Sequence, residues 1–209
     1  MIGAVLVALA LLLVPGAGAQ PAPAEPVMRA DTLRLDAARS VIRWRGTKFR
    51  GLRDHSGTVR LAGGYLLAEG SSVRGGAFRI DMNAIEVTDI PASDPVPRRR
   101  LRDHLRSDHF FATATYPAAD FRLREVRPAG PGRYDVLGDL TMRGRTHPVR
   151  FAARSVPLAG GGMRATAQLS IDRQRWGVAY RGVGEMLVDD MIHLGLDLVF
   201  SHRDTEARR

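Results

Sequence analysis

The stretch GAFRIDMN, residues 76 to 83, alternates apolar residues with polar ones from Phe78 onward. Phe78, Ile80 and Met82 fall on one side of an extended chain, and Arg79 and Asp81 fall on the other. A period of two is typical of a β-strand that buries one face, because successive side chains point to opposite faces of a sheet. This stretch therefore predicts a strand whose apolar face belongs to the interior of the protein.

The same period recurs along most of the chain and predicts an all-β fold. It is visible at residues 32–35, 42–45, 134–142, 164–172 and 192–200. Turn-forming residues, such as the three glycines at 160–162, separate these stretches. Short strands joined in this way are typical of antiparallel sandwiches and barrels, whereas a parallel sheet would need helical patterns between the strands.

Only one helical pattern interrupts the strands, at residues 98–107. Pro97 suits the first position of a helix, and two leucines spaced four residues apart share one helix face. The helix belongs to a proline-rich insertion, residues 91–111, that ends in Phe110 and Phe111. We expect this insertion to cover one end of the β structure, either as a moving lid or as a fixed plug.

The N-terminal residues 1–19 have the features of a secretory signal peptide. An apolar run from Ile2 to Val14 is followed by Ala17-Gly18-Ala19, which fits the small-x-small rule for cleavage. We expect residues 20–30, rich in proline and alanine, to form a flexible tether, and residues 202–209 to form a polar tail. The chain contains no cysteine, which excludes disulfides and a thiolate metal site. We therefore expect one domain, residues 31–201, in a periplasmic or secreted protein.

The chain is strongly basic, with 31 lysines and arginines against 22 aspartates and glutamates and a formal net charge of +9. Lys48 is the only lysine, and the abundance of Arg, Ala, Gly and Pro is typical of a GC-rich coding sequence. The arginines alternate with apolar residues, as expected for the solvated face of strands, and no aromatic RNA-binding motif accompanies them. We therefore expect no nucleic-acid partner, and we interpret Arg98-Arg99-Arg100 as a solvated face rather than a docking patch.

Residues with catalytic or metal-binding side chains do not form a known sequence motif. Asp54, His55 and Ser56 are consecutive, and neighbours in a strand point to opposite faces, so they cannot form a triad with one another. His104 and His109 are five residues apart, a poor spacing for one helix face, and no G-x-S-x-G motif occurs. We predict no catalytic site, no metal site and no cofactor; convergence of histidines from distant strands is the alternative.

Several motifs resemble those of the YceI-like family in their order and spacing. They are WRGTK (44–48), HSG (55–57), GGAFRIDMNAIEVTD (75–89), HLRSDHFFATATYPAADF (104–121), YDVLGDLTMRGRTHPVRF (134–151), SIDRQRWGV (170–178) and VDDMIHLGLDL (188–198). The resemblance runs from Asp31 to Ser201. It implies an exported, lipocalin-like antiparallel β-barrel of about eight strands. It also implies that the interior holds a polyisoprenoid or isoprenoid-quinone chain.

The alternation and the resemblance together indicate which residues would line such a barrel. The expected apolar lining comprises Trp44, Phe78, Ile80, Met82, Phe110, Phe111, Phe121, Leu140, Leu169, Ile171, Leu194 and Leu196. Lys48, Arg50 and His55 lie near a predicted strand end and within the matched region, and we expect them at the mouth. Ordinary core packing is the alternative for the apolar set, and a solvated loop is the alternative for the polar set.

From the sequence we predict a non-catalytic protein that sequesters or carries an isoprenoid lipid or quinone as its ligand and makes transient contact with a membrane surface. One alternative is an interaction protein with a packed barrel, whose basic face docks on a partner or an anionic membrane. Another is an enzyme acting on a bound isoprenoid, which would need a titratable residue with a perturbed pKa inside the tunnel. The sequence leaves the oligomeric state open, a homodimer included.

Overall fold

The computed structural model of the chain describes residues 31–48, 51–69, 72–181 and 188–202. Within these ranges its elements are β1 (Asp31–Leu35), β2 (Val41–Lys48), β3 (Arg53–Glu69), β4 (Ser72–Val87), α1 (Pro95–Arg106), β5 (Ala118–Pro128), β6 (Arg133–Met142), β7 (Arg145–Pro157), β8 (Met163–Asp172), the 3-10 helix η1 (Arg173–Trp176) and β9 (Val188–Ser201). The expected signal peptide and tether lie outside the described residues, as do Arg50 and the tail beyond His202.

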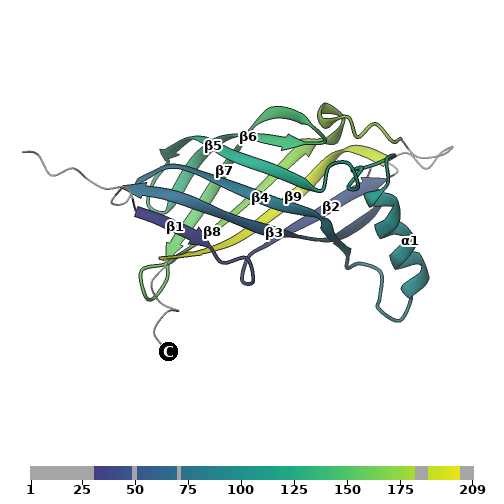
Figure 1. Ribbon diagram of the computed structural model, residues 1–209, viewed down its shortest axis with the longest axis horizontal. Coiled ribbons are helices and arrows are strands. Elements are labelled where there is room, and N and C mark those ends of the chain that lie inside the picture. Colours follow the sequence, from purple (N-terminus) through teal and green to yellow (C-terminus); the bar gives the residue numbers. More distant parts are fainter. Residues whose placement is uncertain (1–30, 49–50, 70–71, 182–187, 203–209) are drawn as a thin grey trace, which may run out of the picture.

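The strands form a closed antiparallel barrel, as the sequence predicted (Figure 1). Around the barrel the order is β3-β2-β9-β8-β7-β6-β5-β4, and β4 pairs again with β3. Strand β1 shares one position with β2, because both lie between β3 and β9 and pair with successive parts of these two strands. The described residues therefore build eight strand positions, and closure gives each strand a partner on both sides.

The short break between β1 and β2 satisfies its backbone hydrogen bonds locally. The buried Ser40 hydroxyl accepts a hydrogen bond from the Val199 amide at 2.9 Å, and the Asp36 amide donates to the Val199 carbonyl at 2.9 Å. The Asp36 carboxylate accepts from the amides of Ala38 and Arg39. Because buried backbone groups need partners, these bonds allow the chain to leave the sheet and return to the same strand position.

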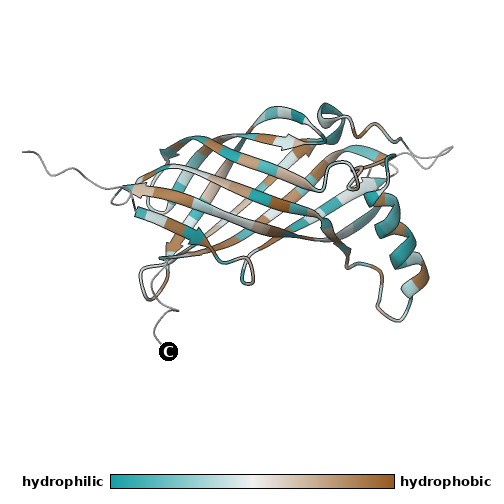
Figure 2. Cartoon of the chain, in the orientation of Figure 1, coloured by the Kyte–Doolittle hydropathy of each residue, from teal (hydrophilic) through white to brown (hydrophobic). Residues whose placement is uncertain are grey.

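The period of two determines the two faces of the barrel wall. On β4, Phe78 and Met82 are buried while Arg79 is exposed, and Figure 2 shows this alternation as bands along the strands. On the outer face, the guanidinium of Arg164 donates two hydrogen bonds to Asp197, at 2.7 and 2.6 Å. These bonds lower the pKa of the Asp197 carboxyl. The strands thus present apolar side chains inward and charged ones to solvent.

Gly57, in the HSG motif, permits a close contact inside the barrel. A Cβ atom at this position would lie 1.8 Å from the Glu86 carbonyl oxygen and 2.7 Å from the ring of Trp44. The indole Nε1 of Trp44 donates to the carbonyl of Thr58 at 3.3 Å. Only glycine leaves room for Trp44 against the backbone of β3, so this residue positions the aromatic ring.

Helix α1 lies at one end of the barrel and packs against β4 (Figure 1). We call this end the helix end. The helix begins at Pro95, three residues earlier than predicted, and ends one residue earlier, with Ser107 as its C-cap. Two prolines fit its first turn because the first N–H groups of a helix lack intrahelical acceptors. Among the residues described, none of the helices is both long enough and apolar enough to cross a membrane.

Candidate functional site: an apolar cavity inside the barrel

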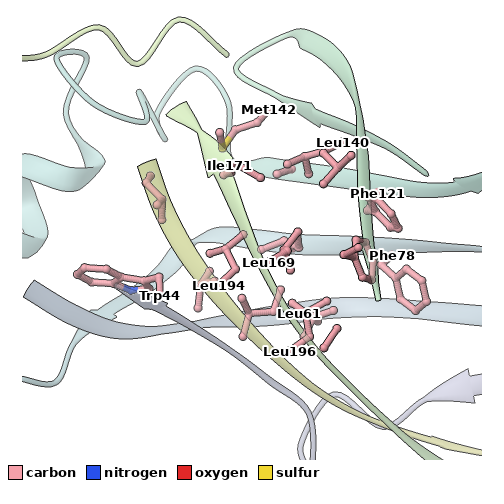
Figure 3. A pocket seen from close by; sticks show the side chains of 18 of the residues that line it. Trp44, Leu61, Phe78, Phe121, Leu140, Met142, Leu169, Ile171, Leu194 and Leu196 are labelled. Carbon is pink, nitrogen blue, oxygen red and sulfur yellow. The ribbon is translucent and has the colours of Figure 1, made fainter. Parts of the chain in front are cut away.

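The barrel encloses a cavity of about 400 Å³ with an almost entirely apolar lining (Figure 3). Its size falls within the range of small-molecule sites, about 300–1,000 Å³. All twelve residues expected in the apolar lining border it: Trp44, Phe78, Ile80, Met82, Phe110, Phe111, Phe121, Leu140, Leu169, Ile171, Leu194 and Leu196. This cavity argues against a fully packed barrel, which the sequence left open as an alternative. Contact of these residues with a ligand stays a prediction.

The strand register places these residues in rows that cross the barrel wall. On β2, β9 and β8, Trp44 pairs with Leu194 and Leu194 pairs with Leu169. A second row, on β4, β5 and β6, joins Phe78, Phe121 and Leu140. The two rows lie on different sides of the cavity in Figure 3. Both walls therefore offer apolar surface to whatever occupies the space between them.

Small residues on β7 and β8 leave the room that the cavity occupies. Ala153, Ala165 and Ala167 border it, and Ala167 pairs with Ala153 on one side and Leu196 on the other. Ala77 and Gly195 are small strand residues that do not add to this space. Their chain neighbours Phe78, Leu194 and Leu196 line the cavity instead, so Ala77 and Gly195 belong to the outer face.

Gly138 has a different role from the alanines. A Cβ atom on this residue would lie 2.2 Å from the ring of Phe121. The ring is stacked on Phe78, with centroids 6.4 Å apart, and lies 5.9 Å from the ring of Phe151. Gly138 therefore admits a cluster of aromatic rings to the wall rather than adding to the open space.

Polar lining residues lie at both ends of the cavity: Arg154, Ser155 and Thr166 at the end away from α1, and a second group at the helix end, which we call the mouth. Two of the three polar residues expected there, Lys48 and His55, border the cavity; Arg50 lies outside the described residues. Thr47 and Asp189 also border it, and the Thr47 hydroxyl donates to the Asp189 carboxylate at 2.5 Å. The mouth thus combines apolar walls with a few fixed polar groups, which is the usual composition of a site that orients a ligand.

His104 and Tyr180 belong to the mouth and were not predicted as site residues. The His104 ring lies 4.6 Å from the ring of Tyr180 and 5.7 Å from that of Phe110. Burial, with smaller contributions from the positive charges of His109 and Lys48, lowers the pKa of His104. His104 stands three residues after Leu101 and directly before Leu105, so helical periodicity already placed it on the inward face.

Arg173 is a fully buried cation at the mouth, also missed by the sequence analysis. Its guanidinium donates to the carbonyls of Val178, Val188 and Asp189, and to the Asp190 carboxylate at 3.1 Å. It also lies 5.7 Å from the centroid of the Phe110 ring. Four of its five N–H donors are thereby engaged, which assigns Arg173 to holding the mouth rather than to contacting a ligand. The alternation of β8 continues to position 173, a signal that would have placed this arginine inside.

The segment after α1 is held at the rim of the mouth by many backbone hydrogen bonds. Phe110 is buried, and its carbonyl accepts a hydrogen bond from Arg143. The amide of Phe111 donates to Leu105, and that of Thr113 donates to Arg106. These bonds favour a fixed segment at the rim over a moving lid. Tyr116, at the end of this segment, is exposed and packs beside Gly144 of the β6–β7 turn.

The potential catalytic and metal-binding side chains lie apart from one another. His55 bonds to the carboxylate of Asp89 at 2.7 Å, across two strands, rather than to its chain neighbours. On the outer face, Ser170 bonds to His193 at 2.7 Å. His147 lies on the same face of β7 as the cavity-lining Val149 and packs against the buried Trp176. Among the residues that the structure describes, no group of three or more His, Asp and Glu side chains could hold a metal ion.

Two solved structures share this fold with low sequence identity. BcnA from Burkholderia cenocepacia is 20% identical, with a TM-score of 0.64 over 79% of this chain and 98% of that chain. A polyisoprenoid binding domain from Saccharophagus degradans, implicated in plant cell wall breakdown, is 16% identical, with a TM-score of 0.61 over 83% and 99% of the two chains. At these identities the likeness establishes the fold.

Curated relatives match over shorter stretches. A UPF0312 protein of Shewanella denitrificans is 45% identical over 53 residues, 25% of this chain and 28% of that protein. A UPF0312 protein of Vibrio vulnificus is 34% identical over 99 residues, 43% of this chain and 52% of that protein. The chain thus spans about half the length, or less, of these relatives. The family model of the YceI-like domain, however, matches residues 33–200. This range includes all or part of each of the nine strands described above. The chain therefore belongs to the YceI-like domain family.

Proposed function

We propose that this protein is an exported, non-catalytic carrier that holds one isoprenoid lipid, a polyprenyl chain or an isoprenoid quinone, in its barrel. The observation that carries the proposal is the continuous apolar cavity, which extends from Lys48 and His104 at the mouth to Tyr134 and Met163 near the opposite end. Two findings support it: membership in the YceI-like domain family, and a structural neighbour described as a polyisoprenoid binding domain.

The physical basis of binding is burial of apolar surface. Moving an isoprenoid chain from water into this cavity gains about 25 cal/mol for each Å² of apolar surface removed from water. The isoprenoid chain has no polar atoms that need hydrogen-bond partners. The leucine, isoleucine and phenylalanine side chains of the wall therefore need to offer only a space of the right shape and volume. An elongated cavity therefore selects a linear chain by its length and width.

The mouth supplies the few polar groups that a head group needs. Lys48 and His104 border the cavity there and present a cation and an imidazole, and Tyr180 presents a phenol. A hydroxyl, a phosphate or a quinone carbonyl could each accept a hydrogen bond from such groups. Triad chemistry requires a nucleophile, a base and an acidic residue that orients the base. Lys48, His104 and Tyr180 do not form such a set, and we assign them to binding.

A cavity-filling substitution tests the proposal. Ala167→Phe would place a phenyl ring in the cavity, and we expect it to reduce the lipid content of the protein at least about tenfold, because the ring and the chain would occupy the same space. Lipid content is measured by organic extraction and mass spectrometry after incubation with a polyprenol or an isoprenoid quinone. Gln168→Phe is the matched control, since Gln168 is exposed on the outer face of the same strand.

Circular dichroism and thermal unfolding establish that each variant is folded. Ala165→Phe, at the next inward position of β8, replaces Ala167→Phe if the latter does not fold. Equal lipid content in the wild type, the folded cavity variant and Gln168→Phe would contradict binding inside the barrel.

A further inference from the structure

Helix α1 carries a concentration of positive charge beside the mouth. Residues 95–106 contain five arginines and one aspartate. Leu101, His104 and Leu105 face the cavity, whereas Arg99 and Arg100 are exposed to solvent. No ion pair involves Arg99 or Arg100 within the described part of the chain. One element therefore contacts the lipid cavity on one side and presents unpaired cations on another.

The remaining arginines of α1 lie close to one shared carboxylate. Arg98, Arg102 and Arg106 converge on Glu86, but at 3.9, 3.9 and 4.0 Å, distances beyond a direct hydrogen bond. The buried Nε atoms of Arg102 and Arg106 have no hydrogen-bond partner among the residues described. Arg106 also donates to the carbonyls of Asn83 and Ile85, and Arg102 also lies 3.5 Å from the Asp103 carboxylate. Arg98 therefore keeps the most donors for further oxygen atoms.

These arginines border a hollow at the surface. It lies between β4 and α1 and is bordered by Glu86, Ala92, Pro95, Arg98, Arg99 and Arg102. Guanidinium groups bind phosphate oxygens with a geometry that suits two hydrogen bonds at a time. The hollow therefore offers donors to a phosphate that approaches from outside the barrel.

Exposed apolar side chains accompany these cations. Val96, in the first turn of α1, is 52% exposed, and Leu52, beside the start of β3, is 85% exposed. Strand β3 begins at the same end of the barrel as α1, because its partner β2 ends at Lys48, which borders the mouth. A surface that combines cations with exposed apolar residues is typical of proteins that lie on anionic membranes.

The sequence alone favoured a solvated face for Arg98-Arg99-Arg100, but their position beside the mouth favours a docking role. We propose that the surface formed by Leu52, Val96, Arg98, Arg99, Arg100 and Arg102, which we call the docking face, binds phospholipid phosphates of an anionic bilayer and sets the mouth against the membrane. The proposal rests on the proposed function, because an isoprenoid must leave a bilayer to enter the cavity. Exposure of the isoprenoid to water costs free energy in proportion to its apolar surface. Docking at the mouth would let the isoprenoid move between bilayer and cavity without this exposure. The positive charge of α1 complements the negative surface of such a bilayer.

Vesicle sedimentation tests the docking face with the full folded chain. We expect the protein to sediment with vesicles of phosphatidylglycerol and phosphatidylcholine but not with pure phosphatidylcholine. The double variant R99E/R100E should bind the anionic vesicles at least about tenfold more weakly, because each basic group near the surface contributes to attraction. The control is R122E/R150E, which makes the same change in net charge at two exposed arginines of β5 and β7.

Three results would overturn the proposal. Equal loss of vesicle binding in both double variants would mean that net charge, rather than the docking face, is responsible. Undiminished binding by R99E/R100E would exclude these arginines. Loss of wild-type binding in millimolar inorganic phosphate, but not in chloride of equal ionic strength, would indicate a site for free phosphate instead. Lipid content after incubation with polyprenol in detergent is measured in parallel; retained content with lost docking leaves the carrier function intact.

Discussion

Protonation of His104, at the mouth, affects the stability of the fold. Burial is the main reason that its pKa is lowered, with additional repulsion from His109 and Lys48. The folded state therefore binds this proton more weakly than the unfolded chain, in which the pKa of histidine is about 6.5. The stabilising contribution is present above that pH, and it is lost as the pH falls through the lower pKa of the folded state.

The corresponding prediction concerns His104→Gln. The free energy of unfolding, measured with urea at neutral pH and about pH 5, should fall less on acidification in this variant than in the wild type. The control is His193→Gln, which removes a histidine from the outer face. An identical decrease in His104→Gln and the wild type would show that His104 does not contribute to the acid sensitivity.

Single residues also show which parts of the site the sequence could reveal. The inward positions of Phe78, Leu169 and Leu194 followed from alternation, because a strand has only two faces. Alternation likewise places Ala77 and Gly195 on the outer face, next to the inward-facing Phe78 and Leu194. The pairing of His55 with Asp89 depends on how β3 meets the end of β4, and a linear pattern does not contain that geometry.

At the scale of elements, η1 and the start of β9 are joined by Arg173. Its four hydrogen bonds satisfy three backbone carbonyls and the Asp190 carboxylate. Arg173→Met would keep the length of the side chain but leave these buried carbonyls without a donor. We expect it to reduce the free energy of unfolding in urea by at least about 2 kcal/mol.

The neighbouring substitution Arg175→Met provides the comparison. Arg175 is exposed, and its guanidinium carbon lies 5.5 Å from the centroid of the Trp176 ring. Its replacement should therefore lower the free energy of unfolding by less than about 1 kcal/mol. Equal effects of the two substitutions would contradict the structural role of Arg173.

The start of α1 shows that sequence signals place the end of an element only approximately. Pro97 was expected to open the helix, but Pro95 does so, because either proline fits the first turn.

At the scale of the whole molecule, closure of the barrel and the space inside it depend on different properties. Closure follows from strands of matching period and from the pairing of β3 with β4. The cavity depends on the balance between alanines on β7 and β8 and the aromatic cluster around Phe121. That balance is a property of three-dimensional volume, so the sequence could indicate the lining but could not separate a tunnel from a packed core.

Native mass spectrometry of the protein purified from an exporting host tests the central claim most directly. The account predicts a one-to-one adduct whose mass, after organic extraction, is that of an isoprenoid lipid or quinone. The same measurement after incubation with polyprenols and quinones covers the case of a ligand lost during purification. A mass that corresponds to the protein alone under both conditions would contradict the account, and the barrel would then not be an isoprenoid carrier.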